Sequence, residues 1–99
     1  MQEVHVLSRC ALREEQIKNT DWFRGAAHEF IQSARRQPGC LDYYLLARDN
    51  RPEIYYIYSS WLSDFYWNEY LNEGHIQKTL AFKNTFLKAL NIVPMKVVR

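Results

Sequence analysis

The 99-residue sequence has few glycines, prolines and cysteines: three, three and two, respectively. The glycines are isolated, so no glycine-rich loop is available to bind the phosphates of a nucleotide or flavin. The two cysteines, Cys10 and Cys40, match no metal-ligand spacing and are too few for a disulfide framework. The histidines (His5, His28 and His75) form no HxH or HxxxH pair. We therefore expect neither a metal site nor an organic cofactor.

The sequence also lacks a strong excess of either charge. Thirteen basic and eleven acidic residues give a net charge of +2, and Arg35-Arg36 is the only adjacent basic pair. A nucleic-acid-binding protein typically has a basic stripe, so we expect no nucleic acid partner. No apolar run approaches the ~20 residues of a membrane span, and no N-terminal stretch has the length of a signal peptide. These patterns predict a cytoplasmic protein without a membrane partner.

Half-polar aromatic residues, by contrast, are concentrated in one part of the sequence. Between Tyr43 and Tyr70 the chain holds all seven of its tyrosines and two of its three tryptophans. Tyr and Trp combine a large apolar body with a polar tip, which suits a pocket or an interface better than a dry core. We expect the functional site here.

The length predicts one domain spanning residues 1–99. Alternating or continuous apolar patterns predict strands at residues 4–10, 41–48, 54–61 and 91–98. Apolar residues at helical spacing predict a helix at 21–37, with Thr20 as N-cap, and a second helical region in two pieces, 63–73 and 75–90, interrupted at Gly74. Pro38-Gly39 ends the first helix.

The resulting order, β-α-β-β-α-β, predicts an α+β fold of the ferredoxin-like type, with a four-stranded antiparallel sheet and both helices on one face. The first two strands are parallel in this topology, which places Cys10 and Cys40 at opposite ends of the sheet. Their separation would be roughly 20 Å, whereas a disulfide requires Cα atoms within about 7 Å. We expect two free thiols.

Both faces of the predicted sheet are rich in apolar groups. On the 54–61 strand, Ile54, Tyr56 and Tyr58 alternate with Tyr55 and Ile57. Two helices cover only one face, and the other needs a partner. A second copy of the same sheet is the simplest partner, so we predict a homodimer in which the two sheets form a shared barrel. A monomer with a wet, tyrosine-rich face is the alternative.

Three motifs carry a resemblance to a known family. They are Gln37-Pro38-Gly39-Cys40-Leu41-x-Tyr43, the strand end Tyr58-Ser59-Ser60-Trp61, and Leu71-x-x-x-His75. In this order and spacing the chain resembles an antibiotic biosynthesis monooxygenase (ABM) domain of the dimeric α+β barrel superfamily. The resemblance implies oxidation of a small phenolic or quinol-like aromatic with dioxygen, without a cofactor.

The chain departs from the family pattern at one position and from its haem-degrading branch at several. Ser59 replaces a glutamate common two residues before the tryptophan. The Asn, Trp and His of the haem-degrading branch would fall near Ser8-Arg9, Tyr70 and Leu80, and none of them matches. The resemblance therefore does not extend to haem degradation.

Two residues are candidate catalytic groups. The resemblance gives Trp61 the role of holding the substrate ring; the alternative is a core anchor at the barrel end. His75 follows Gly74 at a predicted helix N-terminus, where the dipole keeps an imidazole neutral and able to act as a base toward a phenol. Alternatively, its side chain caps the helix or fixes the turn.

Candidate substrate-binding residues are Arg9, Tyr43, Ser59, Phe65 and Tyr70. The aromatic ones can line a flat pocket, and Arg9 can pair with a phenolate, although core packing and a surface ion pair are the respective alternatives. Two other functions stay open. The loss of glutamate at Ser59 favours a non-catalytic dimeric binding module for a small aromatic. An isomerase of a small carbonyl metabolite would act without oxygen.

Overall fold

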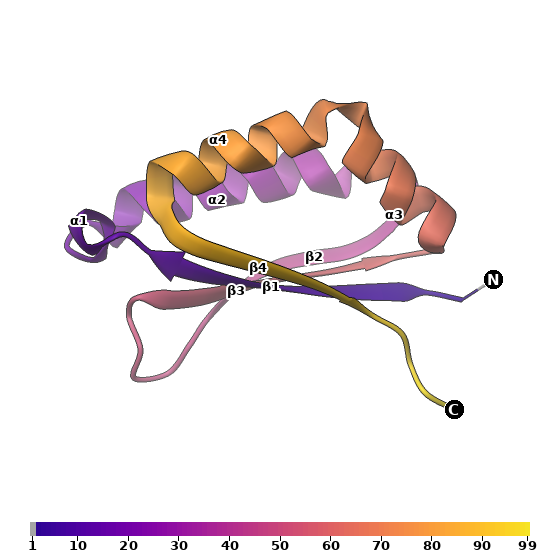
Figure 1. Ribbon diagram of the computed structural model, residues 1–99, viewed down its shortest axis with the longest axis horizontal. Helices are drawn as coiled ribbons and strands as arrows, with labels where there is room; N and C mark the ends of the chain where they lie inside the picture. Colours follow the sequence, from indigo (N-terminus) through magenta and orange to yellow (C-terminus); the bar gives the residue numbers. More distant parts are fainter. Residues whose placement is uncertain (1) are drawn as a thin grey trace.

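The computed structural model describes residues 2–99, except for the side chain of residue 73. Four strands and a set of helices form one layer of helices on one sheet (Figure 1). The elements in chain order are β1 (Val4–Leu12), α1 (Glu14–Ile17), α2 (Thr20–Arg35), β2 (Cys40–Ala47), β3 (Ile54–Trp61), α3 (Asp64–Tyr70), the π-helix η1 (Leu71–His75), α4 (Ile76–Phe86) and β4 (Leu87–Met95).

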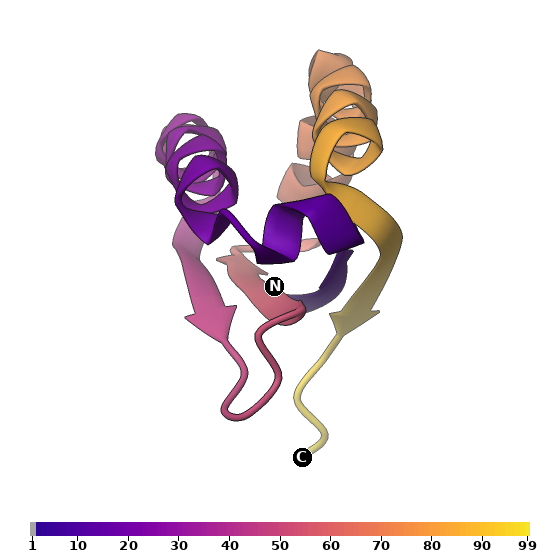
Figure 2. The same cartoon turned by 90° about the vertical axis from the view of Figure 1, so that its left-hand side faces the viewer.

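The sheet has the order β2-β3-β1-β4, and every neighbouring pair is antiparallel. Figure 2 shows α2 and α4 above the sheet, while the opposite face has no helix over it. The predicted ferredoxin-like fold is confirmed. No helix among the described residues is long and apolar enough to cross a membrane.

The core lies between the helices and the sheet. Residues at every second position of β1 and β3 point toward the helices, as the two-residue period of a strand requires. On α2, Phe23, Ala27, Ile31 and Ala34 are buried at the predicted helical spacing. Phe23 contacts Tyr55 and Phe86, with ring centroids 4.8 and 5.9 Å away, and so joins both helices to the sheet.

The boundary between α4 and β4 differs from the prediction. The helix ends at Phe86 rather than residue 90, and the last strand begins at Leu87 rather than residue 91. Leu87 has an extended backbone (φ −115°, ψ 139°) and is opposite Leu12 of β1. Pairing with β1 satisfies backbone groups along the whole of β4, and this long-range gain overrides the helical spacing of the leucines. Pro94 lies in β4, an edge strand, where proline is tolerated because one side of the strand has no neighbour.

Two smaller differences occur at helix starts. Asn19 is the N-cap of α2 and Thr20 its first residue, one position earlier than predicted. The polar stretch before it contains the short helix α1. Ser63 is the N-cap of α3, and its side chain makes no capping hydrogen bond.

The two cysteines are free and lie at opposite ends of the sheet, as expected. Cys10 is opposite Tyr55 on β3, whereas Cys40 is opposite Trp61 at the other end of the same strand. The turn before Cys40 depends on Gly39, which has φ +78°; a Cβ there would overlap the ring of Tyr66. A residue with a side chain would be strained at this turn both by its backbone and by the contact.

The sheet face away from the helices, called the open face below, is largely apolar. Leu46, Val93 and Met95 lie on it and are 47%, 41% and 44% exposed. Tyr44 and Tyr58 stack on the same face with their rings nearly parallel, at an interplanar angle of 5°. A single copy of the chain thus leaves large apolar side chains in contact with water.

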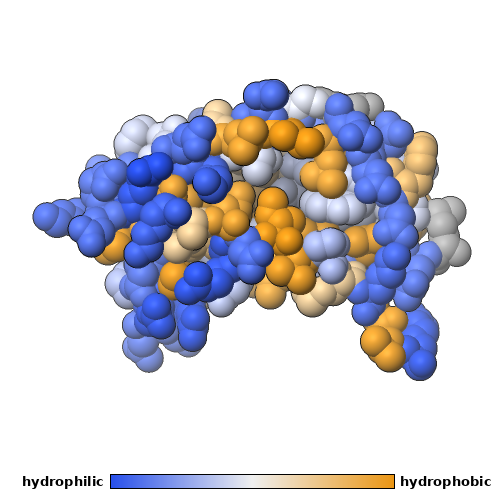
Figure 3. All heavy atoms as spheres, in the orientation of Figure 1, coloured by the Kyte–Doolittle hydropathy of each residue, from blue (hydrophilic) through white to orange (hydrophobic). Residues whose placement is uncertain are grey.

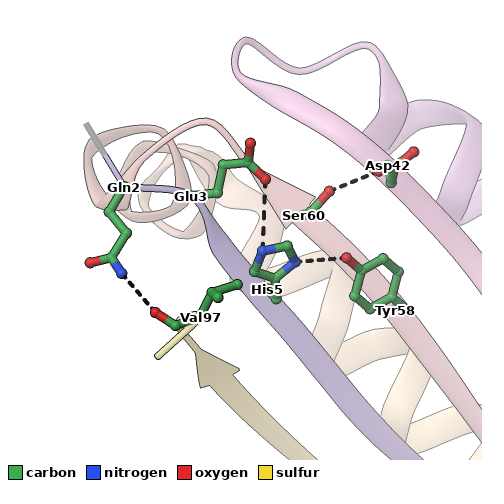
Figure 4. A network of polar contacts seen from close by, with 7 residues as sticks. All are labelled: Gln2, Glu3, His5, Asp42, Tyr58, Ser60 and Val97. Carbon is green, nitrogen blue, oxygen red and sulfur yellow. Dashed lines mark hydrogen bonds and ion pairs between the residues drawn. The ribbon is translucent and has the colours of Figure 1, made fainter. Parts of the chain in front are cut away.

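One end of the open face carries polar contacts (Figure 4). His5 Nδ1 lies 2.7 Å from the Tyr58 hydroxyl, and His5 Nε2 lies 3.7 Å from a carboxylate oxygen of Glu3. On the neighbouring strand the Ser60 hydroxyl donates to Asp42 over 3.1 Å. The Gln2 side chain donates to the Val97 carbonyl over 3.2 Å and links the two chain ends.

Candidate functional site

A cavity of about 220 Å³ lies between the helices and the sheet. Its floor includes Ser8, Cys10, Tyr43, Ile57, Ser59 and Ile92, which belong to all four strands. Its roof includes Phe30, Trp67, Tyr70, Ile76, Leu80 and Phe82, which belong to α2, α3 and α4. None of the described residues that line it carries a charge. The cavity can therefore hold an apolar or aromatic molecule, and its few hydroxyl groups decide how that molecule is oriented.

The most polar feature of the wall is a pair of tyrosine hydroxyls. The hydroxyl oxygens of Tyr43 and Tyr70 lie 3.3 Å apart, and either can donate to the other. The two residues are 6% and 5% exposed. Each hydroxyl has one proton, so the pair uses one proton internally and leaves the second for another acceptor.

Both tyrosines remain neutral at physiological pH. Burial raises the pKa of Tyr43 far above its usual value, and the neighbouring Tyr70 adds to this effect. Burial also raises the pKa of Tyr70, although the hydrogen bond from Tyr43 acts in the opposite direction. The pair can therefore donate a hydrogen bond to an anion but cannot itself act as a base near neutral pH.

Trp61 lies one layer behind the cavity wall. It is fully buried at 0% exposure and is not among the lining residues. Its Nε1 donates to the Ser59 hydroxyl over 3.1 Å, and its ring stacks on Tyr70 with centroids 4.6 Å apart. Trp61 thus orients two residues that do line the cavity.

His75 is not among the lining residues but contacts one of them, Tyr70. Its ring stacks on that of Tyr70 with centroids 4.3 Å apart and an angle of 28°, and the residue is 7% exposed. On its other side it lines a surface groove between α2 and α4, together with Glu29 and Lys78. The imidazole is therefore placed to fix the ring of Tyr70.

The expected helix N-terminus at His75 is absent. The chain continues from α3 through η1 into α4, and the backbone of His75 is itself helical (φ −68°, ψ −25°). Gly74 has φ +80°, so the local irregularity falls where the sequence predicted it. However, the i→i+5 hydrogen bonds of a π-helix occupy N–H groups that a helix start would leave free. The dipole argument for a neutral His75 consequently does not apply.

Two predicted binding residues lie away from the cavity. Arg9 is between Ser8 and Cys10, which both line the cavity, so the alternation of the strand places Arg9 on the open face. Phe65 is 60% exposed and borders a shallow groove next to Pro38. In a single chain, neither residue reaches a molecule in the cavity.

The structure adds residues that the sequence reasoning did not select. Ser8 and Cys10 follow from the alternation of β1, which was a usable signal. Ile92 was missed because the sequence reasoning did not assign which face of the last strand points toward the helices. Burial raises the pKa of the Cys10 thiol from 9.0 to about 12, so the sulfur is a protonated, weakly polar part of the floor.

Comparisons with known proteins identify the family of the chain and its shared fold. The family model described as antibiotic biosynthesis monooxygenase matches residues 7–81. No curated protein matches the sequence. Solved structures match over nearly the whole chain at low identity, which shows the shared fold.

Three of these structures illustrate the high structural similarity and the low sequence identity. A crystal structure of an antibiotic biosynthesis monooxygenase has a TM-score of 0.80 at 18% identity, covering 97% of this chain and 99% of the other. PA3566 from Pseudomonas aeruginosa has a TM-score of 0.83 at 13% identity, with coverages of 100% and 97%. A conserved protein from Methanosarcina mazei Go1 has a TM-score of 0.84 at 17% identity, with coverages of 99% and 95%.

Proposed function

Because the chain belongs to the antibiotic biosynthesis monooxygenase family, we propose that it oxidises a small phenolic or quinol-like aromatic with dioxygen. The reaction takes place in the cavity between the helices and the sheet. The observation that carries this proposal is the neutral hydroxyl pair of Tyr43 and Tyr70 in an otherwise apolar wall. Such a wall accepts an aromatic ring and offers a hydrogen-bond donor to its oxygen.

The reaction balances without a further reductant. A phenol with a hydrogen at the para carbon reacts with one dioxygen to give a para-quinone and one water. One oxygen atom becomes the new carbonyl, and the other leaves as water with the two hydrogens that the substrate loses. The ring supplies all four electrons, so the reaction requires no separate reductant, and we propose that it proceeds without a metal or an organic cofactor.

The protein contributes by stabilising the phenolate. A phenolate gives up an electron to dioxygen more readily than the neutral phenol does. Where water is excluded, a fixed hydroxyl donor directed at the phenolate oxygen stabilises the charge more than it would in water. The pair of Tyr43 and Tyr70 can supply one such donor, because burial keeps both hydroxyls protonated and only one of the two protons is used between them.

Trp61 and His75 act as positioning residues in this proposal. Both rings stack on Tyr70, at centroid distances of 4.6 and 4.3 Å. Trp61 also holds the Ser59 hydroxyl, which lines the cavity. Ser59 then offers a second hydroxyl to the substrate in the position where the family glutamate is replaced.

We further propose that the protein acts as a homodimer joined through the open face. The exposed Leu46, Val93 and Met95 support this arrangement, since a second sheet would remove them from water. Arg9 lies on the same face and would then belong to the interface. The cavity is on the other side of the sheet, so each copy keeps its own site.

One observation favours a second function, a non-catalytic binding module for a small aromatic. None of the described residues that line the cavity is an acid, a histidine or a lysine that could remove the proton of the phenol. In this case the cavity would bind the phenol without turnover. Binding under argon with no oxygen uptake in air would be its signature.

The test is oxygen uptake by metal-stripped protein over a panel of one- and two-ring phenols with a free para position. Reactions without protein measure autoxidation, and the Tyr70→Phe variant measures the contribution of the cavity. Uptake above autoxidation that falls in the variant supports the proposal. Uptake that is equal in the variant, or that depends on added metal, would contradict it.

A further inference from the structure

The volume of the cavity limits the size of its ligand. An apolar cavity of roughly 150 Å³ holds a single benzene ring. The cavity here, at about 220 Å³, holds one ring with substituents or two fused rings. Three fused rings exceed this space. The ring system of the ligand is therefore small, although the ligand as a whole can be longer if part of it leaves the cavity.

The exposure of the lining changes from one end of the cavity to the other. Tyr43 on β2 and Ser59 on β3 are 6% and 3% exposed. Ile76 and Leu80 of α4 and Ile92 of β4 line the same cavity but are 47%, 46% and 39% exposed. Because β2 and β4 are the two edges of the sheet, the cavity runs across it from a buried end with the tyrosine pair to an open mouth. The mouth is mainly aliphatic, although Ser8, opposite Ile92, and Thr79 of α4 add two partly buried hydroxyl groups.

The mouth can be followed in Figure 3, which views the molecule from the side of α4 and β4. Hydrophobic atoms gather along the helix and over the strand below it, with a hollow of paler atoms between them. Exposed aliphatic groups next to a cavity are stabilised when an apolar part of a ligand covers them. The polar end is inside and the apolar end faces water, which suits an amphipathic molecule that enters with its hydroxyl first.

We propose that the ligand is a phenol of one or two rings that carries an aliphatic chain. The ring lies at the Tyr43 and Tyr70 hydroxyls, and the chain leaves between α4 and β4 across Ile76, Leu80 and Ile92. The phenolic head rests on the proposed function. The chain rests on the shape and polarity of the cavity, which hold whether or not turnover occurs.

The experiment measures binding under argon, so that no oxidation takes place, for phenol and its meta-methyl, meta-propyl and meta-butyl derivatives, which keep the para carbon free. Calorimetry measures the affinity, and tryptophan fluorescence, to which Trp67 of the lining contributes, reports occupancy. A fully buried methylene strengthens binding about fourfold, and one at a half-exposed mouth about twofold. We expect meta-butylphenol to bind about 15-fold more tightly than phenol.

Two variants locate the chain. In Leu80→Gln combined with Ile92→Thr, the ratio of the affinities for meta-butylphenol and phenol should fall to about fourfold or less. The matched control is Leu62→Gln, because Leu62 is 39% exposed but does not line the cavity. In the control the ratio should stay near that of the unmodified protein.

The possible results test the ligand proposed here separately from the proposed oxidation. The proposed aliphatic chain of the ligand would be ruled out by an affinity that does not rise with its length. An equal rise in the Leu80→Gln, Ile92→Thr double variant would also rule it out. A three-ring phenol that binds as tightly as phenol would overturn the size limit. A rise with chain length but no oxygen uptake would leave this inference standing and remove the proposed function. Oxygen uptake without a rise of affinity along the series would support the proposed function and rule out the aliphatic chain. Failure of every phenol to bind would rule out both the proposed function and this inference.

Discussion

The hydroxyls of Tyr43 and Tyr70 lie 3.3 Å apart, although the two residues are separated by 27 positions in the sequence. Tyr43 comes from an edge strand and Tyr70 from the last residue of α3. Their contact brings two neutral donors to one point of an apolar wall. Trp61 and His75 both stack on the second of these rings and so hold it in place.

Removing either hydroxyl of the pair should reduce activity more than stability. For Tyr43→Phe or Tyr70→Phe we expect kcat to fall about 100-fold, the typical contribution of one preorganised donor. The free energy of unfolding should fall by only about 1 kcal/mol, because one buried hydrogen bond is lost. Tyr66→Phe, on α3 but outside the cavity, is the matched control. If Tyr43→Phe or Tyr70→Phe keeps the full kcat, the tyrosine pair does not act as the hydrogen-bond donor to the substrate.

Substitution of Trp61 should act first on stability. Trp61→Ala removes a fully buried indole, so we expect the free energy of unfolding to fall by about 3–5 kcal/mol. Trp61→Phe keeps a ring against Tyr70 but loses the hydrogen bond to Ser59. This variant should stay folded and raise KM more than it lowers kcat. Denaturant unfolding and steady-state kinetics measure the two effects; an unchanged stability of Trp61→Ala would contradict the buried position.

Two substitutions of His75 distinguish a catalytic base from a residue that positions Tyr70. His75→Phe preserves a ring that can stack on Tyr70 but has no titratable nitrogen. If His75 positions Tyr70, this variant should keep most of the kcat of the unmodified protein and the same pH profile, whereas His75→Ala should lose about tenfold or more. Equal losses in both variants, with a limb missing from the pH profile, would instead identify His75 as the base.

The Cys10 thiol should make stability depend on alkaline pH. Burial raises its pKa from 9.0 to about 12 in the folded protein. Below pH 9 the thiol is protonated in both states, and stability is unaffected. As pH rises above 9, the unfolded chain loses the proton while the folded protein keeps it, so stability falls by about 1.4 kcal/mol per pH unit. Urea unfolding between pH 8 and 10 should show this slope, reduced in Cys10→Ala; identical slopes would refute the burial of the thiol.

The oligomeric state tests the open face. The double variant Leu46→Glu and Val93→Glu places charges where the second sheet would pack, and we expect it to elute as a monomer. Unmodified protein should have the mass of a dimer by light scattering. Val98→Glu is the control, since Val98 is 95% exposed outside the sheet. A monomeric unmodified protein, or a dimer that survives the double variant, would show that the open face is not the interface.

Much of the fold is predictable from two periods in the sequence. The two-residue alternation around Tyr55 and Ile57 and the helical stripe around Phe23 and Ala27 determine which faces are buried. Because each pattern is local and repeated, the order of elements follows. The clustering of tyrosines directed attention to the same region, and Tyr43, Ser59 and Tyr70 line the cavity there, although their role in function stays a prediction.

The remainder depended on contacts between distant segments. Leu87 and Leu90 have helical spacing, and only the pairing of β4 with β1 shows that they belong to a strand. Depth is equally hidden: the sequence places Trp61 and His75 near the site but gives no sign that Tyr70 stands between His75 and the cavity. Arg9 differs, since the alternation of β1 puts it on the face opposite Ser8 and Cys10, and its place could be predicted from the sequence.

The most direct test of the central claim is the fate of isotopically labelled dioxygen. Metal-stripped protein is mixed with a one- or two-ring hydroxyarene that has a free para position, and the quinone is reduced at once to prevent exchange of its oxygens with water. The account predicts one labelled oxygen atom per product, formed much more slowly by Tyr70→Phe. Product without label, or labelled product formed equally fast by Tyr70→Phe, would contradict a monooxygenase that works through the tyrosine pair.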